Sequence, residues 1–293
     1  MTRADGPGVA APAAGAPGAE ASALLAARYG AGAPAPATAV PAGVAALLDR
    51  RVVRRYRDEA VPDPLLDLLL AAAQSAPTKS DLQQYSVLVL RDRARIKRIA
   101  GWIGSMDWIA TAPVFLLWCG DMRRGQRLCG LAGMEHANNN LDTFLNTAVD
   151  CALAMGACIA AADTDGLGTC PISYVRNHIE KITPLLGLPP GVYPLAGLTL
   201  GWPVFRRPVS MRLPPAVVVH RERYDDSALA EHVAAYDADR RAREPLAPAS
   251  LKNNDVYPPR EGVGWSENCA RQLSVPERYG FAAYLRTRGF ALA

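Results

Sequence analysis

One long apolar stretch at residues 138–162 (NNNLDTFLNTAVDCALAMGACIAAA) constrains the fold of this chain more than any other feature. Apolar side chains recur in it at the three- and four-residue spacing of a helix. They are Leu141, Phe144, Leu145, Ala148, Val149, Ala152, Met155, Cys158 and Ile159. From Cys151 onward nearly every residue is small or apolar, and a helix that is apolar all round is buried on all sides. We therefore expect a central core helix. A second interpretation, in which this helix also packs against another subunit, stays open.

The same stretch does not have the composition of a membrane span. Asp142, Asn146 and Asp150 interrupt it. The apolar run that remains is far shorter than the roughly 20 residues that a crossing needs. We therefore expect no membrane partner.

The composition argues against several other partners and sites. The net charge of +4 over 293 residues is too small and too evenly spread to favour nucleic acid. The six cysteines contain no CxxC pair and lie mostly in apolar surroundings, which is typical of reduced core cysteines in a cytoplasmic protein. The four histidines lack zinc-ligand spacing, so we expect no metal site.

The first 40 residues are almost entirely alanine, proline and glycine. Repeated prolines oppose a helix and bulky apolar residues are lacking, so we expect residues 1–43 to be a disordered leader, with room for a short helix at 21–29. No apolar core follows the charged start, which argues against a signal peptide. The order of later elements gives no boundary, and we expect 44–293 to form a single domain.

A cluster of arginines opens this expected domain. Arg50, Arg51, Arg54 and Arg55 lie within six positions of one another. Such a run is more often a solvated face of the protein. Guanidinium groups also bind phosphate oxygens in a bidentate manner, so an anion site is the alternative.

Helices and well-separated apolar strands follow the arginines. A helix that opens at Pro64 leads into a polar loop at 75–84, which offers hydroxyl and amide groups to a ligand or is an ordinary turn. We expect strands at 85–90, 113–119, 168–174 and 193–201, and 216–220 is a further candidate strand. This order predicts an α+β fold in which helices flank one sheet.

These segments together resemble the FMN-dependent nitroreductase family, and in particular its NADPH-preferring oxygen-insensitive nitroreductase and flavin reductase branch. Four stretches carry the resemblance: RRVVRRYRDEAVP from residue 50, SAPTKSDLQQYSVLVLRD from residue 75, GLGTCPISYVRNHIEKITPLLGLPPGVYPLAGLTLGWP from residue 166, and the closing helices WSENCARQL and GFAAYLRTRGF. The resemblance covers 44–293. It implies a three-layer sandwich with a central mixed or antiparallel sheet, and a homodimer that is built on the long central helix and holds FMN at the subunit interface.

The resemblance also implies roles for individual residues. The positions that match the family's FMN site are Arg50, Arg51, Val52, Arg54, Thr78, Lys79, Ser80, Gln83, Pro171, Ile172, Ser173 and Arg212. In this assignment the arginines at 50, 51 and 212 bind the phosphate, the loop at 78–83 lies beside the ribityl chain and ring, and the segment 171–173 crosses the ring. The substrate-side positions are Asp81, Met106 and Arg278.

Three positions depart from the family pattern. Ser210 replaces a phosphate-site lysine, Met106 stands where the branch has a glutamine, and Asp81 occupies a position that is often apolar. The loop that the resemblance assigns to the NADPH 2′-phosphate also lacks a clear arginine pair, with only Lys252 and Arg260 near it, so the nicotinamide preference and the natural acceptor stay open.

The resemblance implies an FMN-dependent oxidoreductase that uses NADPH or NADH in a ping-pong hydride transfer to a planar aromatic acceptor, such as a nitroaromatic, a quinone or a flavin. We expect no catalytic side chain, because the flavin N5 carries the chemistry. Two alternatives stay open. One is an FMN-dependent reductase or dehydrogenase dedicated to one pathway substrate, and the other is a flavin- or partner-binding protein without turnover.

Overall fold

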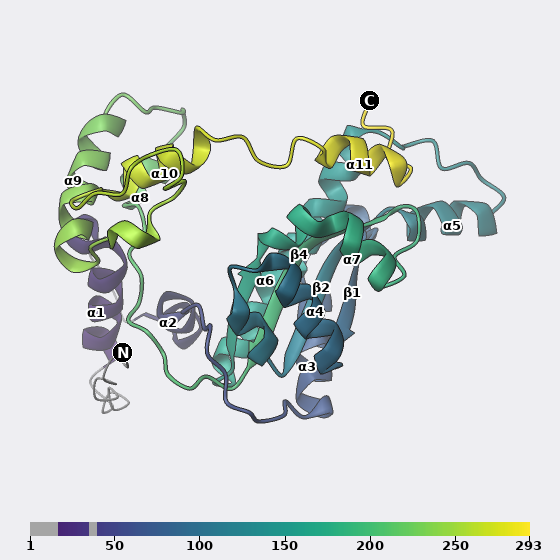
Figure 1. Cartoon of the computed structure of the whole chain (residues 1–293), viewed down its shortest axis with the longest axis horizontal. Coiled ribbons are helices and arrows are strands. Elements are labelled where there is room, and N and C mark those ends of the chain that lie inside the picture. The colour runs from purple at the N-terminus through teal and green to yellow at the C-terminus, as the bar shows by residue number, and fades with distance from the viewer. Residues whose placement is uncertain (1–16, 35–39) are drawn as a thin grey trace. The chain divides into compact units, whose positions relative to one another are not determined.

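The computed structural model describes residues 17–34 and 40–293 and groups the chain into two compact units. Unit 1 comprises Met1–Arg51, as far as it is described, and Pro208–Glu277, whereas unit 2 comprises Val52–Arg207 and Arg278–Ala293. Figure 1 labels the elements of both. The domain expected over 44–293 thus includes parts of both units, and its boundary at residue 43 stays a prediction.

Unit 2 is built on a four-stranded antiparallel sheet with the strand order β1-β2-β4-β3. The strands are β1 (Tyr85–Leu90), β2 (Val114–Asp121), β3 (Gly168–Ile172) and β4 (Val192–Gly201). In the register of the sheet, Leu88 pairs with Leu117, and Leu116 pairs with Leu198. The four long apolar strands predicted from the sequence are therefore present, whereas the candidate strand at 216–220 is wrong, because a short helix, α8 (Pro215–Val218), begins there at two consecutive prolines.

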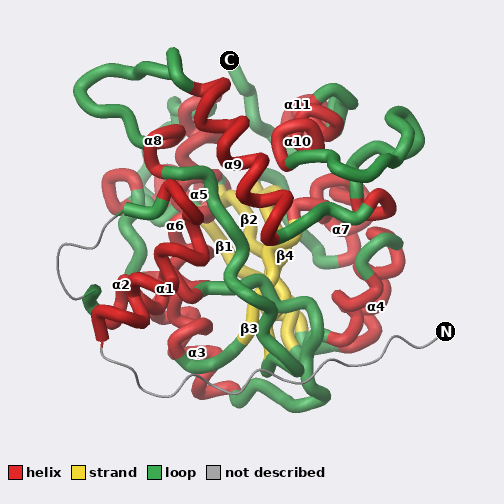
Figure 2. The backbone as a smooth tube through the Cα atoms, turned by 90° about the vertical axis from the view of Figure 1, so that its left-hand side faces the viewer, coloured by secondary structure: helices red, strands yellow, loops and turns green. Residues whose placement is uncertain are grey.

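Helices cover both faces of this sheet. They are α3 (Asp63–Gln74), α4 (Arg93–Ile103), α5 (Arg123–Leu131), α6 (Leu141–Thr164), α7 (Ile179–Leu185) and α11 (Phe281–Thr287), with the short 3₁₀ helices η2 (Lys79–Asp81), η3 (Asp107–Thr111) and η4 (Ser173–His178). Figure 2 shows the yellow sheet between α3 and α6 on one side and α4 and α7 on the other. The expected α+β three-layer sandwich is confirmed.

The central strand β2 explains why both layers pack tightly. Successive side chains of a strand point to opposite faces of the sheet. Leu116 and Trp118 accordingly belong to the core with α3 and α6, whereas Phe115 and Leu117 belong to the core with α4. Every residue of β2 is buried as a result.

The long apolar stretch forms α6, a helix of 24 residues. Asn140 caps its N-terminus, because its side chain accepts a hydrogen bond of 3.0 Å from the Thr143 amide. By length and composition alone the helix could cross a membrane. It carries the buried Asp150, however, and packs against α3 and β2 inside unit 2. It is therefore a core helix of this unit.

The expectation that α6 is buried on every side is wrong within this chain. Its buried residues are Thr143, Thr147, Asp150, Cys151, Ala154, Cys158, Ile159 and Ala162. On the opposite face Leu141, Leu145, Val149 and Leu153 are 54%, 55%, 47% and 44% exposed. Both faces repeat with the helical period, so the spacing alone could not tell which one packs inside the chain.

Unit 1 is helical in the part that the structure describes. Its elements are α1 (Pro17–Tyr29), η1 (Gly30–Gly32), α2 (Ala42–Asp49), α8 (Pro215–Val218), α9 (Leu229–Arg243), η5 (Pro248–Ser250) and α10 (Trp265–Leu273). The ring of Tyr236 on α9 meets the ring of Trp265 on α10 edge-on, with the centroids 5.4 Å apart. Buried Asp237 accepts hydrogen bonds from the amide and the hydroxyl of Ser266, which joins the same two helices.

The disorder expected for the leader does not extend to α1. Residues 1–16 and 35–39 lie outside the described part of the chain. Helix α1 begins at Pro17 rather than at residue 21, and its Arg28 is only 4% exposed. Composition could not show this burial, because the carbonyl groups that hold Arg28 lie far along the chain.

Candidate functional site

Each unit contains one group of the predicted site residues. In unit 1 these are the arginines assigned to a phosphate. Arg50 directly follows the last residue of α2 with an extended backbone (φ −54°, ψ 133°), and Arg212 lies shortly before α8. The arginines thus lie at helix ends and in loops, where a side chain can reach a ligand.

Arg51 is already engaged within the chain. Its two terminal nitrogens donate to the two carboxylate oxygens of Asp49 at 2.9 and 2.6 Å. A bidentate pair of this kind uses the whole guanidinium fork. A phosphate contact from the Arg51 side chain would therefore require this pair to open.

Arg50 and Arg212 have no such carboxylate. Arg212 donates to the Ser210 hydroxyl at 2.9 Å and to the carbonyl of Met211 at 3.0 Å, which satisfies only part of its guanidinium. Among the described residues, neither Arg50 nor Arg212 forms an ion pair. No carboxylate in the described part of the chain neutralises their positive charges.

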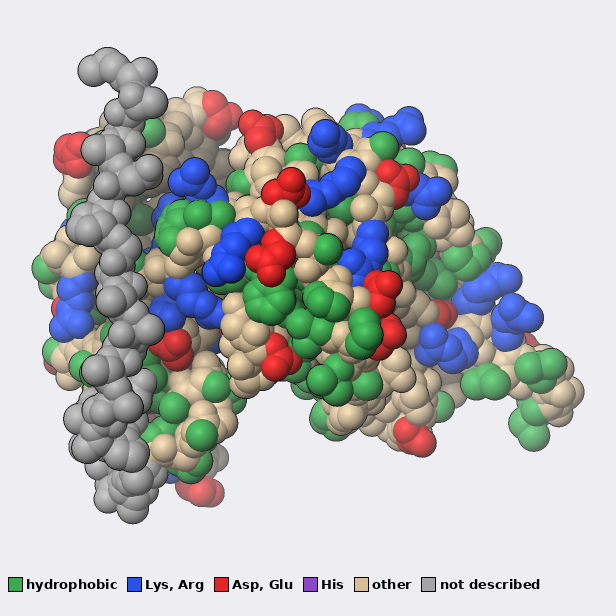
Figure 3. Space-filling view, turned by 90° about the horizontal axis from the view of Figure 1, so that it is seen from below, with side chains coloured by type: hydrophobic (Ala, Val, Ile, Leu, Met, Phe, Trp, Pro, Cys, Tyr) green, Lys and Arg blue, Asp and Glu red, His purple; other side chains and the backbone are tan. Residues whose placement is uncertain are grey.

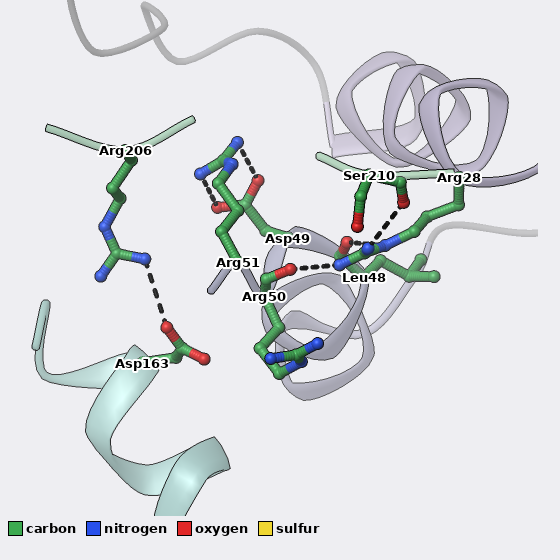
Figure 4. Close-up of polar contacts among 8 residues, drawn as sticks. All are labelled: Arg28, Leu48, Asp49, Arg50, Arg51, Asp163, Arg206 and Ser210. Atoms are coloured by element: carbon green, nitrogen blue, oxygen red, sulfur yellow. Dashed lines mark hydrogen bonds and ion pairs between the residues drawn. The ribbon is translucent and has the colours of Figure 1, made fainter. Parts of the chain in front are cut away.

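A third arginine, Arg28 of α1, lies beside these two. Figure 4 shows its guanidinium turned toward the carbonyl oxygens of Leu48, Arg50 and Ser210. Burial, together with the charges of Arg212 and Arg50, lowers the pKa of Arg28 to about 10. Arg28 lies in the short helix expected at 21–29 of the leader, and it was not predicted as a site residue.

In unit 2 the predicted loop has a strained backbone. Ser80, Asp81 and Gln83 have positive φ angles of 49°, 58° and 50°. Residues other than glycine rarely adopt this region, and when they do they are often part of a ligand-binding or catalytic site. The loop is therefore held in shape by its surroundings rather than by its own preference.

Asp150 of α6 holds this loop. Its carboxylate accepts one hydrogen bond from the Lys79 amide at 2.9 Å and one from the Gln84 amide at 3.0 Å, and the residue is only 1% exposed. A buried carboxylate is costly unless it is hydrogen-bonded, so these two amides account for its place in the core. Sequence analysis treated Asp150 only as an interruption of the apolar pattern, although that interruption was the available signal.

Arg124 of α5 also holds the C-terminal end of this loop. Its terminal nitrogens donate to the carbonyl oxygens of Gln83 at 2.5 Å and Tyr85 at 3.1 Å, and to the Ser86 hydroxyl at 3.0 Å. Figure 3 shows Lys and Arg side chains next to hydrophobic ones at the end of unit 2 that carries α5. In the sequence, residues 121–133 indicated only a polar connection between two elements, so Arg124 was not predicted as a site residue.

Strand β3 carries the remaining ring-side residues. Val52 forms an isolated bridge with Thr169, and the amide of Val53 donates to the Thr169 carbonyl at 2.9 Å. The chain after the arginine pair is therefore fixed beside β3. At the end of β3, Pro171 and Ser173 are exposed, whereas Ile172 is buried, with only 1% of its surface exposed. A ligand can therefore reach Pro171 and Ser173.

Arg54 lies over an aromatic ring in the same unit. Its guanidinium carbon is 6.0 Å from the ring centroid of Trp108 in η3, at the outer limit of a cation–π contact. Met106, which directly precedes η3, is partly buried and packs against the hydrophobic core around α4. Sequence analysis did not identify Trp108 as a partner of the basic stretch.

The substrate-side prediction Arg278 lines a pocket of about 310 Å³ in unit 2. Its Nε donates to the Asn177 side chain at 2.7 Å. His178, Phe281 and Tyr284 also line the pocket, and burial together with nearby Lys181 lowers the pKa of His178. The third substrate-side residue, Asp81, is exposed and accepts a hydrogen bond of 3.0 Å from the Gln83 side chain.

Four thiols of unit 2 lie in the core, whereas Cys129 on α5 is partly exposed. Cys119, Cys151 and Cys158 are fully buried, and Cys170 is 4% exposed. Burial raises the pKa of Cys158 to about 12 and raises the pKa values of Cys119 and Cys151 as well. Thiols of this kind stay protonated and do not act as nucleophiles at neutral pH.

Comparison with known proteins identifies the family. Residues 47–202 match the Nitroreductase family, and residues 210–293 match the Nitroreductase family C-terminal domain. The protein belongs to the nitroreductase family. The resemblance inferred from the sequence motifs is confirmed.

Individual relatives agree with this assignment. The FMN reductase [NAD(P)H] of Bacillus subtilis is 40% identical over 197 residues, which is 66% of this chain and 79% of the relative. The oxygen-insensitive NADPH nitroreductase of Salmonella typhimurium is 32% identical over 245 residues, which is 84% of this chain and 96% of the relative. A hypothetical oxidoreductase from Bacillus subtilis has a solved structure that superposes with a TM-score of 0.79 at 34% identity, over 86% of this chain and 99% of that one.

Proposed function

We propose that this nitroreductase-family protein is an FMN-dependent oxidoreductase that takes electrons from NADPH or NADH. The acceptor is a small planar molecule such as a nitroaromatic, a quinone or a flavin. The observation that carries the proposal is the family match over 47–202, with relatives named FMN reductase and NADPH nitroreductase. When bound, FMN supplies the two-electron transfer, and the residues of the chain bind and orient the reactants.

The arginines of unit 1 fit the phosphate of FMN. Arg50 and Arg212 carry positive charge that no carboxylate of the described chain neutralises, and Arg28 adds a third charge beside them. Arginine forks match phosphate oxygens in geometry and charge. Arg51, which is paired with Asp49, contributes mainly through its main chain and through its charge.

The ring and the ribityl chain are assigned to unit 2. The residues proposed here are Val52, Arg54, Thr78, Lys79, Ser80, Gln83, Pro171, Ile172 and Ser173. The loop at 78–83 is held by Asp150 and Arg124, so its polar groups are fixed in place before any ligand binds. Such preorganisation lowers the entropy cost of binding.

The acceptor side is assigned to Arg278, Met106 and Asp81. The Asn177 side chain orients the Arg278 guanidinium at the wall of its pocket, where it would attract the electron-rich oxygens of a nitro or quinone group. Met106 and Asp81 replace residues common in the family and would shape acceptor preference. They favour a second candidate function, a reductase dedicated to one pathway substrate.

We further propose a homodimer in the cytoplasm. The exposed leucine and valine face of α6 (Leu141, Leu145, Val149 and Leu153) is large, apolar and continuous along the helix. A second copy of the same helix would bury this face, as expected for an isologous interface. The free cysteines support a reducing compartment, since the described residues contain no disulfide.

A visible spectrum of the purified protein tests the function. We expect flavin absorption bands that bleach when NADPH or NADH is added without oxygen, and that return when a nitroaromatic or quinone is added. Bands that persist with both nucleotides would contradict the proposal and favour the dedicated reductase with another electron donor. A colourless protein that does not take up FMN would favour a binding protein in which the arginines dock an acidic partner.

A further inference from the structure

Helix α1 lies outside both family matches and yet is built into unit 1. The matches cover 47–202 and 210–293, whereas α1 ends at Tyr29. Arg243 of α9 donates to the carbonyl of Ala26 at 3.2 Å, and Asp239 accepts from the amide of Ala31 at 3.2 Å. The C-terminal end of the helix is therefore attached to α9, although neither family match covers this helix.

Close packing at the C-terminal end of α1 supports a fixed position of this helix. Gly30 has a positive φ of 56°, and a Cβ atom there would lie 1.6 Å from a carboxylate oxygen of Asp239. A side chain at this position would displace the Asp239 carboxylate and would adopt a strained positive φ, so glycine suits the turn that follows α1. The turn after α1 is thus shaped for this contact.

Arg28 connects α1 to both segments that carry the phosphate arginines. Its Nε donates to the Leu48 carbonyl at 2.8 Å, one terminal nitrogen donates to the Ser210 carbonyl at 2.9 Å, and the other donates to the Arg50 carbonyl. Its own carbonyl accepts from the Arg212 amide at 2.6 Å. One residue therefore fixes the main chain of Arg50 and of Arg212 together, and Figure 4 shows its bonds to the Leu48, Arg50 and Ser210 carbonyls.

The charge of Arg28 is unusual in this place. A buried charge is normally paired with an opposite one, because desolvation is costly. Arg28 is 4% exposed, is hydrogen-bonded only to neutral carbonyl groups, and has the like charges of Arg212 and Arg50 close by. An anion bound to this group of arginines would relieve their repulsion. Ser210 lies directly beside the Arg28 guanidinium, at the position where the family pattern has a lysine.

We propose that α1 is a positioning element for the FMN phosphate and that Arg28 is its positioning residue. The guanidinium of Arg28 holds the backbones of Arg50 and Ser210, and the Arg28 carbonyl holds the Arg212 amide, in the arrangement that binds the phosphate. It also supplies positive charge close to the position where Ser210 has removed one. This inference rests on the proposed function, because it takes FMN as the phosphate ligand.

The test compares FMN with riboflavin, which lacks the phosphate. The dissociation constants of both are measured by flavin fluorescence with apo-protein, for the wild type and for Arg28→Met, Arg28→Lys and Arg271→Met. Arg271 is the matched control, since it is also buried in unit 1 and held mainly by carbonyl groups, those of Lys252, Tyr257 and Pro258. Urea unfolding of each apo-variant shows whether it is folded.

We expect Arg28→Met to weaken FMN binding at least about tenfold, equivalent to about 1.4 kcal/mol, while riboflavin binding changes by less than about twofold. Arg28→Lys keeps the charge but cannot reach three carbonyl groups, so we expect it to weaken FMN binding as well. Arg271→Met should leave both constants unchanged.

Three results would overturn the inference. They are an unchanged FMN constant in Arg28→Met, an equal loss of FMN and riboflavin binding, and full recovery in Arg28→Lys, which would reduce the role of Arg28 to its charge. In each case the wild type still binds FMN, so the proposed function stands. A wild type that binds neither flavin would instead refute the proposed function, and this inference with it.

Discussion

At the scale of single residues, the candidate site depends on polar groups buried in the core. Asp150 is the clearest case, because one carboxylate fixes the two ends of the loop at 79–84 by accepting from two backbone amides. The loop contains three residues with positive φ and would not keep this shape alone. The stability of the site and that of the core are therefore linked through one side chain.

Replacing Asp150 by asparagine tests this link. An amide presents one oxygen and one NH₂ group, so one of the two loop amides would face a donor instead of an acceptor. We expect Asp150→Asn to lower the free energy of unfolding by about 1–3 kcal/mol, as for a buried polar group left unsatisfied. Urea denaturation measures the loss, and hydrogen exchange at the amides of Lys79 and Gln84 should become faster.

Asp165→Asn is the control for this change. Asp165 is exposed and directly follows the C-terminus of the same helix. It should change the free energy of unfolding by less than about 0.5 kcal/mol, the usual range for surface positions. Equal effects of the two substitutions would show that the charge of the helix, and not the contact with the loop, determines the change in the free energy of unfolding.

At the scale of elements, α6 has two functions on two faces. One face, with Asp150 and Cys151, joins the core and holds the candidate flavin loop. The other face exposes Leu145 and Leu153, which are 55% and 44% exposed. An exposed apolar face on a long helix is typical of a protein–protein interface.

The double substitution Leu145→Glu with Leu153→Glu tests the proposed dimer. Two carboxylates on this face would have to be desolvated in an interface, and they would face their symmetry copies across a two-fold axis. We expect the dimer to dissociate to monomers in sedimentation velocity. Leu273→Glu, at a position 83% exposed on α10, should leave the dimer intact. A monomeric wild type, or a double variant that stays dimeric, would contradict the assignment of this face.

At the scale of the whole molecule, the buried thiols report on global unfolding. Cys119, Cys151 and Cys158 are spread over β2 and α6, are fully buried, and have raised pKa values. A raised pKa means that the unreactive thiol form persists well above neutral pH in the folded protein, and that the reactive thiolate forms readily only after unfolding. Cys129 on α5 is partly exposed and serves as an internal reference.

Alkylation at about pH 8, followed by mass spectrometry, should therefore modify Cys129 quickly and the three core thiols slowly. If FMN binds the folded state only, a concentration about 100 times its dissociation constant stabilises that state by about 2.7 kcal/mol. Alkylation of the three core thiols should then slow by about a hundredfold, while Cys129 should be unaffected. Fast labelling of the core thiols in the native protein would show that unit 2 opens locally.

Sequence alone determined which segments of this chain become helices and strands. The apolar period of α6, the four apolar strands and the polar loop before β1 are local patterns, and the structure contains each of them. The order of the motifs was also sufficient to identify the nitroreductase family and its α+β sandwich. Such features depend on neighbours along the chain, and these are visible in the sequence.

Only the tertiary structure decided which side chains meet. The apolar period of α6 could not show that Leu145 faces outward while Asp150 faces the core, because a partner for either face comes from elsewhere in the chain. Composition likewise predicted a disordered leader with room only for a short helix at 21–29, and it could not show that Arg28 is buried, because the three carbonyl partners of Arg28 lie 20, 22 and 182 residues away. Hydrogen bonds over such separations form only when folding brings their groups together, and no local pattern in the sequence records them.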